Sequence, residues 1–118
     1  MSMESILNTI KKMLGLEADY DAFDTDIIVN INMVFNILLQ LGVGPAEGFS
    51  ITGPDETWSD YIDDMRKLEM VKTYIYLKVK QIFDPGTSSA LNNAIDNQIK
   101  ELEWRLNVQV DPAEGNVL

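Results

Sequence analysis

The fold is decided by the stretch TYIYLKVKQIFDPGTSSALNNAIDNQIKELEWRL (residues 73–106), which joins the end of one amphipathic helix to the start of another. Proline lacks an amide hydrogen and disfavours helical geometry in the residue before it, so Pro85 should end the first helix near Asp84. Gly86 permits the turn, and the hydroxyl side chains after it can cap the next helix. These hydroxyl residues are Thr87, Ser88 and Ser89. The stretch therefore predicts two helices that meet at a corner.

Apolar residues recur at spacings of three and four in four segments of the chain, which is the pattern of helices that bury one face. The segments are 3–14, 26–41, 58–83 and 89–106. The third helix would be roughly 39 Å long, whereas a globule of this length should be about 35 Å across. It therefore either spans the whole domain or breaks near Asp63 and Asp64.

Individual residues are expected to cap these helices or to face the core. Ser2 should cap the first helix, and Asp24, Thr25 or Asp26 should cap the second. The last helix should bury one apolar stripe, made of Leu91, Ile95, Ile99, Leu102 and Leu106. The second helix also carries amides on its other faces, which either meet solvent or form hydrogen bonds with neighbouring subunits. These amides are Asn30, Asn32, Asn36 and Gln40.

A long loop, GVGPAEGFSITGPDET (residues 42–57), separates the second and third helices. Its segment 49–52 alternates and contains β-branched residues, which indicates a short strand or hairpin arm. Phe49 and Ile51 need burial, either against their own helices or in a neighbouring chain. The prediction is an all-α bundle of about four helices in one domain, residues 1–106. An extended tail, residues 107–118, follows it, because that segment contains Pro112 and Gly115 and has no periodicity.

The composition excludes several classes of function. The 118 residues include no cysteine and no histidine, which removes disulfides, thiolate chemistry and nearly all zinc, copper or haem ligation. The formal net charge of −10 argues against binding of the nucleic-acid backbone, which depends on cationic side chains. No apolar run approaches the roughly 20 residues of a membrane-spanning helix, so the default expectation is synthesis in the cytoplasm and no membrane contact.

Two acidic clusters could bind a cation, but neither has the spacing of a known site. The first fails as a calcium-binding loop, because the central glycine and the glutamate at its twelfth position are missing. The second lacks the additional ligands of a two-metal nuclease. Helix-start stabilisation explains both clusters better, so we predict no catalytic, cofactor or metal site. The clusters are Glu17, Asp19, Asp21, Asp24 and Asp26, and Asp55, Glu56, Asp60, Asp63 and Asp64.

The two tryptophans belong either to the core or to contacts between subunits, because aromatic side chains supply large contact areas. Trp104 lies outside the apolar stripe of the last helix, beside Glu101 and Arg105. The candidate subunit interface consists of Phe49, Ile51, Trp58 and Trp104.

Several short motifs, in this order and spacing, resemble the head–tail connector (adaptor) proteins of long-tailed bacteriophages. They are YD (20–21) before a helix, QLGVG (40–44) at its end, Trp58 and Tyr61, YLKVK (76–80), FDP (83–85), SS (88–89) and ELEWRL (101–106). Gly86 departs from the pattern, in which a second proline is expected; this should loosen the corner without changing its role.

The resemblance implies a structural protein of the virion neck and not an enzyme. Such proteins form a dodecameric ring beneath the portal protein, extend the DNA channel, and present a platform to a stopper or tail-completion protein. DNA passes through the channel without specific binding. The resemblance also implies that the C-terminal tail docks into the portal, with Val108, Val110, Val117 and Leu118 as anchors.

A second class of function remains open at this point. An acidic helical binding module, such as a regulator that mimics DNA, would present carboxylates spaced like phosphates. The two acidic clusters could supply that face. An enzyme is disfavoured, because histidine and cysteine are absent.

Overall fold

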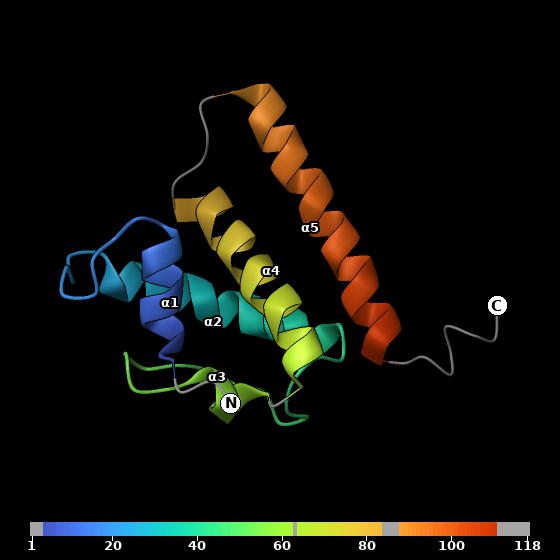
Figure 1. The fold of residues 1–118 in the computed structure, drawn as a ribbon, viewed down its shortest axis with the longest axis horizontal. Coiled ribbons are helices and arrows are strands. Elements are labelled where there is room, and N and C mark those ends of the chain that lie inside the picture. The colour runs from blue at the N-terminus through green and yellow to red at the C-terminus, as the bar shows by residue number, and fades with distance from the viewer. Residues whose placement is uncertain (1–3, 63, 84–87, 111–118) are drawn as a thin grey trace.

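The computed structural model describes residues 4–62, 64–83 and 88–110. They form five helices and no strand: α1 (Ile6–Met13), α2 (Asp24–Gln40), α3 (Trp58–Tyr61), α4 (Met65–Phe83) and α5 (Ser89–Val110). The all-α prediction is confirmed. Helix α4 packs against both α2 and α5, and α1 lies against α2 and α4 (Figure 1). Helix α5 runs alongside α4 in the opposite direction (Figure 1).

The long third helix of the sequence prediction is divided into α3 and α4, which agrees with the second of the two alternatives, a break near Asp63 and Asp64. Ile62 has extended backbone angles (φ −146°, ψ 154°) and ends α3. The carboxylate of Asp64 then accepts a hydrogen bond from the amide of Arg66 (3.0 Å). An aspartate in this position satisfies a free amide at a helix start, so α4 begins at Met65.

The starts of α1 and α2 differ from the sequence prediction. Helix α1 begins at Ile6, because the hydroxyl of Ser5 accepts a hydrogen bond from the amide of Asn8 (3.2 Å). Ser2 is therefore not the cap, and it lies outside the described residues. No side chain caps α2, which starts at Asp24 after Phe23. Asp24 instead forms an ion pair with Lys11, so the expectation of a cap from residues 24–26 was wrong.

The helix ends on either side of the predicted corner agree with the prediction, but the extent of α5 does not; Pro85, Gly86 and Thr87 lie outside the described residues. Helix α4 ends at Phe83, and the hydroxyl of Ser88 accepts a hydrogen bond from the amide of Leu91 (3.2 Å) as a cap. Helix α5 continues to Val110, so the first four residues of the predicted extended tail are helical. Leu91 is exposed and not buried, because the first turns of α5 lie beyond the end of α4 (Figure 1).

The core joins all five helices around two large aromatic residues, Trp58 and Tyr74, which are both fully buried. The indole Nε1–H of Trp58 donates a hydrogen bond to the hydroxyl of Thr9 in α1 (3.0 Å). The Tyr74 hydroxyl donates one to the carboxylate of Glu103 in α5 (2.7 Å). Burial, together with that hydrogen bond and the Glu103 charge, raises the pKa of Tyr74. These polar contacts fix α1 and α5 to the central helices, since a buried donor needs a partner.

The loop at residues 42–57 is fixed to the core by Ile51. Its side chain is buried, its amide donates to Asn32 Oδ1 (2.8 Å), and its carbonyl accepts from Asn32 Nδ2 (3.0 Å). Phe49 packs against Phe35 and Tyr61, with ring centroids 5.2 Å from each. The strand or hairpin expectation was wrong, because the side chain of Asn32 takes the backbone groups of Ile51 that a partner strand would otherwise bind. Phe49 and Ile51 thus find burial against their own chain.

Replacing Asn32 by alanine is expected to destabilise the fold by about 1–3 kcal/mol, because both backbone groups of Ile51 lose their partner. Urea unfolding measures this loss, and limited proteolysis should show faster cleavage within residues 42–57. Asn36→Ala is the control, since Asn36 lies exposed on the same helix. Equal stability of the two variants would contradict the anchoring role of Asn32.

Candidate interaction surface

Two residues of the second acidic cluster act as local hydrogen-bond acceptors, and no metal site is found among the residues that the structure describes. Asp60 Oδ2 accepts a hydrogen bond from the Thr57 amide (2.9 Å) at the start of α3. Glu56 Oε2 accepts from the amide and the hydroxyl of Thr52 (3.0 and 2.9 Å). Partial burial would raise the pKa of Glu56, but these hydrogen bonds and those from nearby backbone amides outweigh it and lower the pKa. Both carboxylates therefore serve the local fold.

The acidic segment before α2 is held by one buried cation. Lys11 is completely buried, and its Nζ lies 2.8 Å from Asp24 Oδ1 and 2.9 Å from the carbonyl oxygen of Ala18. A buried ammonium group needs such partners, because its charge is otherwise far from water. Lys11 thus joins α1, the following loop and the start of α2.

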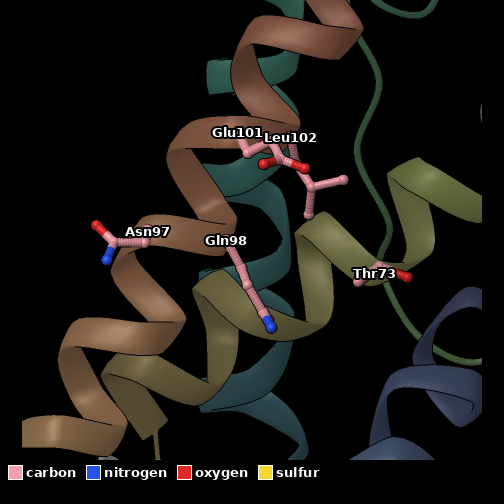
Figure 2. A pocket seen from close by; sticks show the side chains of 5 residues that line it. All are labelled: Thr73, Asn97, Gln98, Glu101 and Leu102. Carbon is pink, nitrogen blue, oxygen red and sulfur yellow. The ribbon is translucent and has the colours of Figure 1, made fainter.

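A groove of about 400 Å³ runs between α4 and α5. It is lined by Thr73, Asn97, Gln98, Glu101 and Leu102, and Figure 2 shows that Asn97 points away from α4. These are amide, hydroxyl, carboxylate and aliphatic groups. They include no nucleophile paired with a base, which an acid–base or covalent mechanism requires. The groove offers no catalytic arrangement.

A more distinctive surface lies where the start of α2 meets the end of α4, and we call it the α2–α4 hollow. Phe23 packs edge-on against Phe83, with ring centroids 5.2 Å apart. Val29 and Ile82 are 54% and 52% exposed, which is unusual for large aliphatic side chains that lie together. The hollow has a volume of about 410 Å³ and is lined by Phe23, Asp26, Val29, Asn30, Ile82 and Phe83.

Trp104 is a second exposed apolar feature, on the outer face of α5. Its side chain is 68% exposed. It lies beside an ion pair within the same helix, between Arg105 Nη2 and Glu101 Oε2 (3.1 Å). An aromatic side chain surrounded by polar groups is characteristic of contact sites between proteins.

Comparison with protein families gives a match over nearly the whole chain. The model of a family described as phage connector protein matches residues 6–113, which include all five helices. The chain belongs to the phage connector protein family. Searches among curated proteins and solved structures gave no match. Membership gives the protein a structural role at the neck of the phage particle, in a family that is not typically enzymatic.

The residues predicted for the subunit interface of this connector protein have different environments. Ile51 and Trp58 are buried in the core of their own chain, and Phe49 is half-buried beside them. Trp104 alone of the four presents most of its side chain to the surface. Of the predicted portal anchors, Val108 and Val110 lie in the last turn of α5, whereas Val117 and Leu118 lie outside the described residues.

Sequence reasoning did not identify the α2–α4 hollow of the connector protein. One signal was present, since Val29 and Met33 lie four residues apart and off the main apolar stripe of the second helix. The contribution of Phe23 and Ile82 had no sequence signal, because they come from segments far apart in the chain. Among the described helices of this connector protein, none combines the length and apolarity that crossing a bilayer would require.

Proposed function

We propose that this protein forms a ring at the phage neck, beneath the portal protein, that extends the DNA channel and joins the head to the tail. The observation that carries the proposal is the match to the connector family over residues 6–113. The exposed apolar side chains of the α2–α4 hollow and of Trp104 support it, because such surfaces on a single chain mark contacts with other chains. Twelve copies form the proposed ring, and a stopper or tail-completion protein binds its other side.

The C-terminal segment is the proposed attachment to the portal, with Val108, Val110, Val117 and Leu118 as apolar anchors. Asn107 Nδ2 lies 3.4 Å from the carbonyl oxygen of Leu41, at the end of α2. This contact ties the last turns of α5 to the domain. A segment that carries apolar anchors beside a fixed helix suits docking into a neighbouring protein.

Removing residues 111–118 is expected to abolish stable binding to the portal and to leave the fold intact. The truncation begins after Val110 because α5 extends to that residue, so the contact between Asn107 and Leu41 is retained. Co-sedimentation with purified portal measures the attachment, and circular dichroism with thermal unfolding serves as the control for the fold. Full attachment of the truncated chain would rule out a docking role for residues 111–118, with their anchors Val117 and Leu118.

A channel built from this chain should not retain DNA. Each chain carries a formal net charge of −10, and phosphates are repelled at short range by such a surface. Fluorescence anisotropy with duplex DNA is therefore expected to show no binding at low salt and no dependence on salt concentration. Tight binding at low salt that weakens with added salt would contradict the proposed passive channel.

A further inference from the structure

Two apolar features of the molecule lie on opposite sides of the bundle. The first feature, the α2–α4 hollow, lies at the N-terminal end of α2. The second feature, Trp104, belongs to the last turns of α5, and the contact between Asn107 and Leu41 holds these turns at the C-terminal end of α2. Helix α2 has 17 residues, so about 25 Å separates its two ends. Figure 1 shows the same arrangement, with the loop before α2 on the left and the last turns of α5 on the right.

We propose that Trp104 of one copy inserts into the α2–α4 hollow of the next copy. This inference rests on the proposed ring and identifies the contact between neighbouring subunits. A contact between two different surfaces leaves each copy with one donor and one acceptor surface, so addition of copies continues until the ring closes. A pair of copies related by a two-fold axis would instead bring one surface against itself.

The chemistry of the hollow suits an indole ring. Its volume of about 410 Å³ lies within the range of roughly 300–1,000 Å³ found for pockets that hold small organic groups. Phe23 and Phe83 already pack edge-on, and aromatic rings add favourably to such pairs. Val29 and Ile82 supply aliphatic walls that are more than half exposed in the single chain, and they would lose contact with water on insertion.

One pair of opposite charges lies beside the two surfaces. Asp26 lies at the edge of the hollow, and the exposed carboxylates of the preceding loop make that side negative. These carboxylates are Glu17, Asp19 and Asp21. Arg105 follows Trp104 and is 56% exposed. Its ion pair with Glu101 is at the surface, where such pairs contribute little, so Arg105 can bind Asp26 of the neighbouring copy.

Cysteine cross-linking tests this contact cleanly, because the chain has no cysteine of its own. A variant with both Arg105→Cys and Asp26→Cys is treated with a short bismaleimide linker at a protein concentration of about 1 mM, where even a contact with a millimolar dissociation constant is about one-third occupied. The expected product is a ladder of dimers, trimers and higher species. Adding Trp104→Ala to this variant should lower the yield by about tenfold or more, because an interfacial tryptophan carries much of the binding energy.

The controls separate this contact from the alternatives. Arg105→Cys mixed with Asp26→Cys should give dimers and no ladder, since each chain then carries one reactive position. A variant with Leu91→Cys and Asp26→Cys tests the other end of α5, where Leu91 is also exposed, and it should remain monomeric. A ladder from this control, dimers from Arg105→Cys alone, or no ladder from the first variant would each overturn the proposal. Portal co-sedimentation of the same variants tests the neck function separately, so either proposal can fail while the other holds.

Discussion

Replacing Trp58 by alanine is expected to lower the free energy of unfolding by about 3–5 kcal/mol, the range for removing a large buried aromatic side chain. Trp58 is fully buried, and its indole N–H bonds to Thr9 in α1. The ammonium group of Lys72 in α4 lies 5.6 Å from the centre of its ring. The substitution therefore removes a contact between three helices, in a domain whose total stability is about 5–15 kcal/mol.

Trp104→Ala is the matched control, because it removes the same side chain from an exposed position. Its effect on the stability of the single chain should be within about 0.5 kcal/mol. Urea unfolding followed by circular dichroism at low protein concentration measures both variants. If Trp58→Ala does not fold, Trp58→Phe should fold with an intermediate loss, because it keeps an aromatic ring in the core. Similar losses for Trp58→Ala and Trp104→Ala would contradict the assignment of Trp58 to the core and Trp104 to the surface.

Replacing Asp24 by alanine is expected to destabilise the domain by about 3–5 kcal/mol, because it leaves a buried charge without its counter-ion. Lys11 is completely buried and would retain only the carbonyl oxygen of Ala18 as a partner. The loss should spread to the loop before α2, since Lys11 contacts both Asp24 and the carbonyl oxygen of Ala18 in that loop.

Two further variants identify the cause of that loss. The double variant Lys11→Met with Asp24→Ala should recover most of the stability, because an apolar side chain of similar length can fill the buried site without a charge. Asp26→Ala removes an exposed carboxylate from the same helix turn, and its effect should stay below about 1 kcal/mol. Chemical unfolding measures the stability of all three variants, and a double variant that is less stable than Asp24→Ala would contradict the buried ion pair.

The helices were predictable because their signals are local. The periodic stripe of the last helix faces the core. Ile95, Ile99 and Leu106 are buried, and Leu102 is half-buried. Proline at position 85 agreed with a helix end at Phe83. Leu91 fits the same periodicity but is exposed, because burial also depends on where the neighbouring helix ends. Where α4 ends relative to α5 cannot be read from the sequence of either helix alone.

The loop and the buried cation depend on partners that are distant in the sequence. Ile51 alternates like a strand residue, yet Asn32 binds its backbone from 19 positions away. Lys11 has the pattern of a basic residue that stabilises a helix end. Its burial follows from the position of Asp24 in another helix. The charge pattern alone therefore predicted a helix-start role for Asp24 and gave no indication that it pairs with a buried lysine.

Of the two features of the candidate interaction surface, Trp104 could be predicted from the sequence and the α2–α4 hollow could not. Trp104 lies off the apolar stripe, and the sequence alone indicated that it faces outward, which the structure agrees with. Trp58 stands at the start of a short helix, where no periodicity separates a core position from an interface position. The α2–α4 hollow requires Phe23 and Ile82 to meet, which only the packing of α2 against α4 brings about.

Electron microscopy of this chain mixed with purified portal protein tests the proposed neck function most directly. We expect a ring of twelve copies bound coaxially to one face of the portal, with an open channel through its centre. Portal particles that carry no added density, or single copies bound away from the channel axis, would contradict the proposed function.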